Sequence, residues 1–222
     1  MSEASAAGRL GEVRAAIARS AALAGRSQGE VALIAVSKTH PPEAIVPLLE
    51  AGHRIFGENR VQEAQAKWPE LRERYEGVEL HLIGRLQSNK ADEVAELFDA
   101  IHSLDRPSLI PALAAAMAKA GRRPDCFIQV NIGDEAQKGG CAVAELPALL
   151  DAAREAGLPV RGLMCIPPAE LEPAPYFALL AKLARRHALP GLSMGMSADF
   201  ETAVTIGATH VRVGTALFGE RG

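Results

Sequence analysis

Lys38 follows directly on an apolar run, VALIAVS, at residues 31–37. Such a run predicts a buried strand, so the lysine is expected at a strand end, beside a hydrophobic core. A lysine amine that is partly removed from water has a lowered pKa, and its neutral form can attack an aldehyde or ketone to give a Schiff base. The competing interpretation is a lysine whose ammonium simply reaches solvent. Other residues have to decide between the two.

A second feature lies near the C-terminus. The segment GTALFG, at residues 214–219, follows an apolar run at residues 209–213, and its small residues and backbone N–H groups suit a phosphate. The motif SMGMS supplies the hydroxyls of Ser193 and Ser197. Taken alone, a glycine-rich turn is equally typical of a tight loop. A phosphate site beside a Schiff-base lysine is more specific, because pyridoxal 5′-phosphate (PLP) carries both an aldehyde and a phosphate.

Arg212 shares the side-chain parity of Gly214 along the last apolar run, so both are expected to face inward. An arginine does not readily release its proton. Opposite the ring nitrogen of PLP it would leave the pyridine unprotonated and make the cofactor a weaker electron sink than an aspartate partner would. The alternative is an arginine paired with a carboxylate in the protein interior.

Composition limits the classes of partner. The chain has 222 residues, 48% of them hydrophobic, and a formal net charge of −3. A single domain with a sizeable core is expected, with neither nucleic acid nor a membrane as partner. The sequence shows no targeting or membrane-spanning segment, and three cysteines without a Cys-x-x-Cys pair predict reduced thiols. A cytoplasmic protein is the resulting expectation.

Eight short apolar runs alternate with helical patterns. The predicted strands cover residues 31–37, 53–57, 79–84, 99–103, 126–132, 159–164, 191–195 and 209–213. The predicted helices between them cover residues 42–52, 59–75, 90–98, 107–121, 144–157, 174–187 and 198–207. This alternation predicts a single (β/α)₈ TIM barrel, with a doubly wound open sheet as the alternative.

An additional N-terminal helix is predicted at residues 8–25, where Leu10, Val13, Ile17 and Ala21 share one face. Residues 1–8 are interpreted as a tail and residues 9–222 as the barrel domain. In such a barrel the C-terminal ends of the strands meet at one mouth. The polar residues expected there include Lys38, Glu58, Asn59, Arg85, Asp105, Arg106 and Asn131.

Several motifs together resemble one known family. They are AVSKTHP, FGENRVQEAQAK, HLIGRLQSNK, HSLDR, QVNIGDEAQKGG, GLMCIPP, LSMGMSADFETAV and THVRVGTALFGER. In this order, from about residue 9 to 221, they resemble the pyridoxal phosphate homeostasis proteins, which are single-domain barrels similar to the N-terminal domain of alanine racemase. The resemblance implies PLP bound as a Schiff base to Lys38, with Arg212 facing the pyridine nitrogen. It implies further contacts to the phosphate or the pocket wall from Asn59, Ser193, Met194, Ser197, Gly214 and Thr215.

The resemblance implies a carrier that maintains free PLP and supplies it to apoenzymes. Catalysis would need an acid/base group beside the cofactor, and in alanine racemase a tyrosine from a second domain of the partner chain provides one. That domain is absent here, which favours a non-enzymatic monomer. The alternatives are a weak racemase-type PLP enzyme with Lys38 as base, and a cofactor-free Schiff-base aldolase. Lys138 lies in a glycine-rich loop that is expected to be mobile. A solvated side chain is the preferred interpretation, and a role in gating the mouth or receiving the aldehyde is the alternative.

Overall fold

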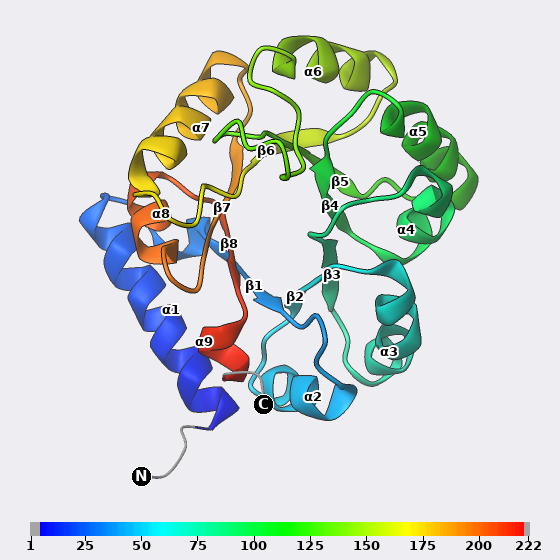
Figure 1. The fold of residues 1–222 in the computed structure, drawn as a ribbon. Coiled ribbons are helices and arrows are strands. Elements are labelled where there is room, and N and C mark those ends of the chain that lie inside the picture. The colour runs from blue at the N-terminus through cyan, green and yellow to red at the C-terminus, as the bar shows by residue number, and fades with distance from the viewer. Residues whose placement is uncertain (1–4, 220–222) are drawn as a thin grey trace.

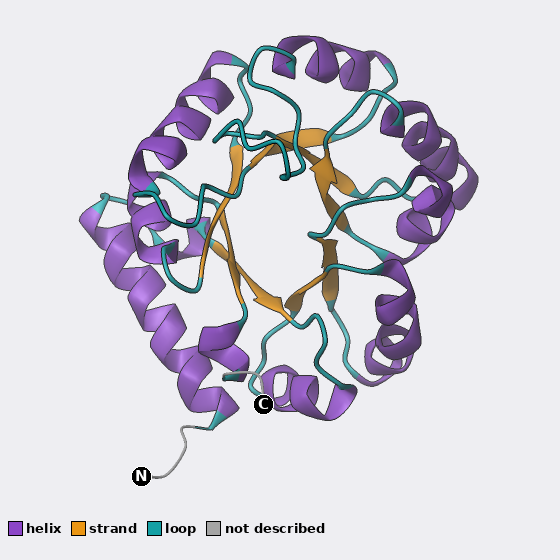
Figure 2. Ribbon diagram, in the orientation of Figure 1, coloured by secondary structure: helices purple, strands orange, loops and turns teal. Residues whose placement is uncertain are grey.

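The structure is a computed structural model that describes residues 5–219. Eight parallel strands pair in chain order, and the last pairs with the first to close a barrel (Figures 1 and 2). The strands are β1 (Ala32–Val36), β2 (Ile55–Glu58), β3 (Glu79–Leu82), β4 (Ala100–Leu104), β5 (Asp125–Gln129), β6 (Val160–Met164), β7 (Gly191–Met196) and β8 (His210–Val213). The predicted (β/α)₈ barrel is confirmed.

Helices surround the strands as an outer ring, as Figure 2 shows. They are α2 (Pro42–Glu50), α3 (Val61–Arg74), α4 (Ala91–Leu97), α5 (Leu109–Ala120), α6 (Leu146–Glu155), α7 (Ala174–Arg186), α8 (Phe200–Ile206) and the short α9 (Thr215–Phe218). Two 3₁₀ turns, η1 (Gln28–Glu30) and η2 (Ser88–Lys90), precede β1 and α4. The apolar faces of the helices cover strands that are buried on both sides, as parallel sheets require.

The N-terminal helix, α1 (Ala6–Leu23), lies beside α8 and α9, where the last strand is followed by only four helical residues (Figure 1). Leu10 and Ile17 of this helix are buried in the hydrophobic core. The helix begins at Ala6 because the Ser5 hydroxyl accepts a hydrogen bond from the Gly8 N–H at 3.1 Å. Residues 6–8, predicted as tail, are therefore helical, and residues 1–4 lie outside the described part.

Strand β5 ends at Gln129, three residues before the predicted end at residue 132. Beyond it the backbone pairs with Cys141: Cys141 N–H donates to Gln129 O and Asn131 N–H donates to Cys141 O, both at 2.9 Å. The Asn131 side chain bonds both the N–H and the carbonyl of Glu135. Asn131 therefore holds the loop that follows β5, because the chain turns away from the barrel before reaching it.

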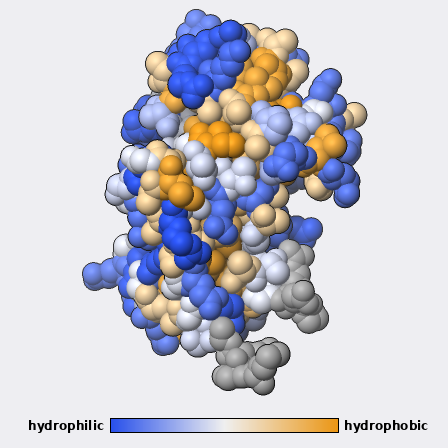
Figure 3. Space-filling model, turned by 90° about the vertical axis from the view of Figure 1, so that its left-hand side faces the viewer, coloured by the Kyte–Doolittle hydropathy of each residue, from blue (hydrophilic) through white to orange (hydrophobic). Residues whose placement is uncertain are grey.

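The surface shown in Figure 3 mixes hydrophilic residues with small, separate apolar patches. Large exposed hydrophobic side chains among the described residues are few and scattered, with Leu23, at the end of α1, the most exposed. None of the helices between residues 5 and 219 has the length and hydropathy needed to span a membrane.

Candidate functional site

A cavity of about 340 Å³ opens at the C-terminal ends of the strands. Its volume lies within the range of small-molecule sites. Six of the eight residues predicted for the cofactor site line it: Lys38, Asn59, Ser197, Arg212, Gly214 and Thr215. The fold thus brings together predicted residues from the ends of β1, β2, β7 and β8.

Lys38 sits in a tight turn after β1. The turn closes with a hydrogen bond of 3.1 Å from His40 N–H to Ser37 O, and Thr39 adopts a positive φ of 65°. A non-glycine residue in this region costs roughly 1 kcal/mol or more, so surrounding contacts must hold it. The His40 ring stacks on Phe218 of α9, with centroids 4.3 Å apart, which joins the first strand end to the last.

A buried charged group lies beneath this turn. Glu58, at the end of β2, accepts hydrogen bonds from Ser37 Oγ at 2.6 Å and from Trp68 Nε1 at 3.0 Å. Its Oε1 also lies 2.9 Å from the Lys67 ammonium of α3. Burial raises the pKa of Glu58, and these three partners act against that rise. Glu58, predicted at the mouth, is thus turned under the Lys38 turn, outside the cavity lining.

Arg212 reaches the cavity from inside the barrel and is only 4% exposed. Its Nη1 donates to Ser193 Oγ at 2.6 Å and its Nη2 to the Cys165 carbonyl at 2.9 Å. Within residues 5–219 no carboxylate oxygen lies within 4.0 Å of its nitrogens, so the predicted alternative of a carboxylate pair is not what the structure contains. Burial lowers the pKa of Arg212. Among the described residues, neutral acceptors alone hold this guanidinium.

A hydrogen-bonded chain continues from Ser193 into the barrel. Ser193 Oγ lies 2.7 Å from His102 Nδ1, and His102 Nε2 lies 3.0 Å from His81 Nδ1. Because Arg212 only donates, the Ser193 oxygen accepts from it and the Ser193 hydroxyl donates to His102. His102 is then neutral, with its proton on Nε2. Burial, followed by nearby positive charge, lowers the pKa of His102 well below its usual value, which agrees with this assignment.

The C-terminal turn provides the expected polar rim. Gly214 N–H donates to Ser197 Oγ at 3.2 Å, which joins the ends of β7 and β8. The first hydrogen bond of α9 comes from Leu217 N–H, so the N–H groups of Thr215 and Ala216 have no acceptor within the helix. Together with the hydroxyls of Ser197 and Thr215, these N–H groups form a set of hydrogen-bond donors that suits a phosphate.

Two predicted site residues lie outside the cavity lining. Ser193 is fully buried below it, and Met194 is fully buried in the hydrophobic core. The register of β7 against β8 shifts between Ser193 and Met196, at Gly195 with φ 93°, so Met196 turns into the cavity and is 38% exposed. A Cβ at Gly195 would meet the Ala203 Cβ at 2.5 Å, which ties this bend to glycine.

Sequence reasoning missed the apolar wall of the cavity. Val36, Ile83, Met196 and Ala198 line it beside the polar residues. Val36 and Ile83 belong to strand-end runs that are typical of a core, so no local signal separates them from buried residues. Lys138 also departs from the prediction: it is half-buried, and its Nζ donates to the Pro167 carbonyl at 2.8 Å.

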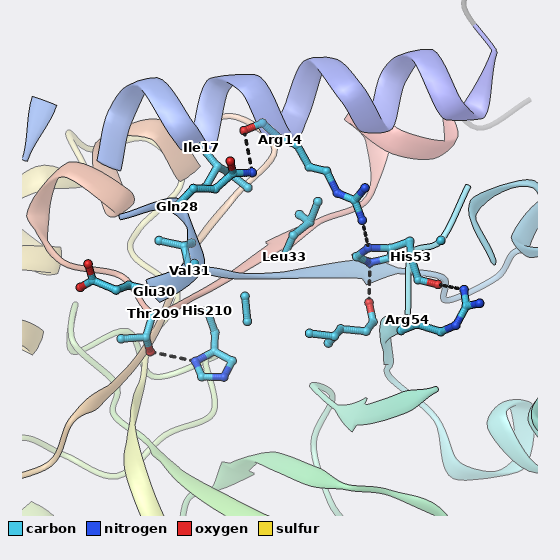
Figure 4. Close-up of a pocket in the computed structure, with 14 residues that line it drawn as sticks. Arg14, Ile17, Gln28, Glu30, Val31, Leu33, His53, Arg54, Thr209 and His210 are labelled. Carbon is cyan, nitrogen blue, oxygen red and sulfur yellow. Dashed lines mark hydrogen bonds between the residues drawn. The ribbon is translucent and has the colours of Figure 1, made fainter. Parts of the chain in front are cut away.

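A larger cavity, of about 730 Å³, lies at the opposite end of the barrel, under α1 (Figure 4). Arg14 and His53 point toward each other across it, with Nη2 and Nδ1 3.5 Å apart. Arg54 donates to the Leu49 and His53 carbonyls. Its described lining residues include no lysine, whereas Lys38 lines the smaller cavity.

The sequence was compared with known protein families and with individual proteins. The sequence matches the family described as "Alanine racemase, N-terminal domain" over residues 10–222. It is 43% identical over 219 residues to the "Pyridoxal phosphate homeostasis protein" of Pseudomonas aeruginosa, covering 96% of this chain and 94% of that one. The chain belongs to the pyridoxal phosphate homeostasis protein family. The resemblance predicted from the motifs is thereby confirmed.

Two solved structures extend this family comparison. PipY of Synechococcus elongatus, solved with PLP bound, matches with a TM-score of 0.84 and 41% identity over 96% of this chain and 100% of that chain. An alanine racemase of Streptomyces lavendulae matches with a TM-score of 0.69 and 21% identity, over 96% of this chain and 58% of that one. The second comparison shows a shared barrel fold alone.

Proposed function

We propose that this chain binds PLP in the cavity at the barrel mouth and acts in PLP homeostasis as a carrier. The observation that carries the proposal is that Lys38, Arg212 and the Ser197/Thr215 hydroxyls line one small cavity. These groups match the aldehyde, the ring nitrogen and the phosphate of PLP. The family name and the PLP-bound PipY structure support the same ligand.

The residues present fit this cofactor. Bound PLP would supply an aldehyde, and Lys38 is the residue that would hold it, through its Nζ amine. Thr215 and Ser197, with the N–H groups at the start of α9, hold the phosphate. Arg212 keeps its proton and leaves the ring nitrogen as an acceptor.

We propose a carrier rather than an enzyme. Turnover of an amino acid needs a second positioned proton donor or acceptor besides Lys38. The described lining includes His40, but its ring stacks on Phe218 at the rim. By this proposal the chain works as a cytoplasmic monomer, and PLP-dependent apoenzymes receive the cofactor.

The test is PLP loading of the purified chain, followed by visible absorption before and after borohydride reduction and by peptide mass mapping. We expect an absorption band that reduction removes and a pyridoxyl mass on the Lys38 peptide. Lys38→Ala should lose both and keep its thermal unfolding temperature. Lys119→Ala is the control, because Lys119 is exposed and pairs with Asp92 on the outer ring.

A folded wild-type chain that gains no band with excess PLP would overturn the proposal. Steady, Lys38-dependent conversion of an amino acid by the loaded protein would replace the carrier with a weak PLP enzyme. For the transfer step, the loaded chain is mixed with a PLP-dependent apoenzyme and its regained activity is followed. A regain no faster than that from an equal amount of free PLP contradicts a supply role.

A further inference from the structure

We propose that Lys67 is a positioning residue for Lys38, because its buried ammonium holds the backbone on both sides of that lysine. The inference rests on the proposed function of Lys38. Lys67 belongs to α3, the helix that follows the second strand, and its side chain is only 5% exposed. The ammonium therefore lies inside the protein, where its partners decide what it does.

Four acceptors surround the three protons of Lys67 Nζ. Two are backbone carbonyls, Ser37 O at 2.9 Å and His40 O at 3.1 Å. The other two are carboxylate oxygens at 2.9 Å, one from Glu58 and one from Glu63. The two carbonyls belong to the residue before Lys38 and to the second residue after it, so one cation holds both ends of the turn.

The two carboxylates that pair with Lys67 also bind the turn itself. Glu63 Oε1 accepts the Thr39 N–H at 2.5 Å, and Glu58 Oε1 accepts the Ser37 hydroxyl. Glu63 and Lys67 stand one helical turn apart on α3 and so reach the same spot. These contacts oppose the strain of the positive φ at Thr39. The Lys38 side chain then starts from a backbone with one defined direction, into the cavity.

Stability alone does not account for this arrangement. A buried ion pair often contributes no more than well-packed apolar residues of similar volume, because removing both charges from water is costly. Here the cost is visible, since Glu58 Oε2 is buried without a hydrogen-bond partner among the described residues. The polar contacts of Lys67 converge on one short turn, and that turn carries Lys38. A fixed origin for the amine increases the fraction of encounters with the aldehyde that are productive.

The test compares Lys67→Met with Arg72→Met. Arg72 is the matched control: it is a partly buried cation of the same helix, but its partners are Leu97 O and Asp99, away from the Lys38 turn. The first readout is amide hydrogen exchange in cofactor-free protein. We expect exchange at Thr39 and His40 to accelerate at least tenfold in Lys67→Met, with the strand amides unchanged. Arg72→Met should leave both amides as in the wild type.

The second readout is the rate of PLP addition, followed by absorption well below the unfolding temperature of each variant. Lys67→Met should add PLP at least tenfold more slowly, whereas Arg72→Met should lose thermal stability and keep the rate. If Lys67→Met does not fold because Glu58 loses its counter-charge, the double variant E58Q/K67M replaces it, with the same expectations.

Equal exchange and equal addition rates in the Lys67 and Arg72 variants would overturn the inference. The exchange measurement uses no PLP, so it decides on the holding of the turn even if the wild type were found not to bind the cofactor. A wild type without PLP addition but with Lys67-dependent protection of the turn would refute the proposed function and leave the positioning contact established.

Discussion

Arg212 donates a hydrogen bond of 2.6 Å from Nη1 to Ser193 Oγ, and both side chains are buried. Ser193→Ala removes the acceptor of this buried cation and the donor to His102 at once. The variant leaves the buried Arg212 Nη1 without an acceptor and the buried His102 Nδ1 without a donor. Because unpaired buried polar groups are costly, we expect a loss of about 2 kcal/mol in the free energy of unfolding. PLP affinity should fall roughly tenfold as Arg212 loses its fixed orientation. Denaturant unfolding and PLP titration measure the two effects.

Ser103→Ala is the matched control for that variant. Ser103 is also fully buried, but its hydroxyl has no hydrogen-bond partner in the described part of the chain. Its removal should leave PLP affinity unchanged and leave the free energy of unfolding equal or slightly higher. If both serine variants lost the same stability and the same PLP affinity, the hydrogen bond between Ser193 and Arg212 would contribute to neither.

Gly84 lies against the backbone of Asn59, a residue of the cavity wall. A Cβ at Gly84 would stand 2.2 Å from Asn59 O and 2.6 Å from Asn59 Cα. Neither backbone atom can turn aside as a side chain can, so Gly84→Ala should displace Asn59. We expect a loss of roughly 2 kcal/mol in stability, as in other overpacked sites, and weaker PLP binding. Thermal unfolding and PLP titration provide the measurements.

Gly11 gives the opposite expectation. It lies within α1, and a Cβ there would meet nothing within 4 Å. Gly11→Ala should therefore stabilise the chain by about 0.5–1 kcal/mol through helix propensity, with unchanged PLP binding. A destabilised Gly11→Ala protein would contradict the described packing of α1 on the barrel.

Two histidines, the buried His53 and the partly buried His210, make the fold sensitive to acid. Burial lowers the pKa of His53 and of His210 to about 4, from an ordinary value near 6.5. The unfolded chain therefore binds more protons than the folded one between about pH 6.5 and pH 4. The stabilisation is complete above the unfolded pKa and is lost as the pH falls through this window, by up to about 3 kcal/mol for each histidine.

The check is the unfolding free energy measured at intervals from pH 7.5 to pH 4.5, in wild type and in His53→Gln. The glutamine amide of this variant retains a donor for the Ile55 carbonyl, which the His53 Nε2 atom contacts at 2.8 Å, but it does not titrate. The variant should lose less stability on acidification than the wild type. An equal slope in both proteins would show that His53 does not contribute.

The three cysteines should be inert in the folded state. Cys126, Cys141 and Cys165 are free and buried, and burial raises the pKa of each thiol to about 12. The reactive thiolate is then almost absent at neutral pH. We expect Ellman's reagent to react slowly with native protein at pH 8 and to titrate three thiols after denaturation. A fast native reaction at any of them would place that thiol at an accessible surface.

Much of the fold was readable from the sequence because its signals are local. Short apolar runs between helical patterns predict a parallel barrel, and a strand end followed by Lys38 predicts a residue at its mouth. Strand parity alone placed Arg212 inside the barrel, where the structure has it. These inferences hold because a strand that is buried on both faces consists of consecutive apolar residues, which are visible in the sequence.

The tertiary structure decided what local patterns do not contain. Strict alternation along β7 does not reveal the register shift at Gly195, which puts Met196 in the cavity and leaves Met194 in the core. The neutral partners of Arg212 come from β7 and from the end of β6, and the cation under Lys38 comes from the helix after β2. The sequence by itself determined which elements form and their order, but not every boundary, since β5 ends at Gln129 and not at residue 132. Contacts between side chains dozens of residues apart depend on strand register and helix placement, which only the closed barrel sets.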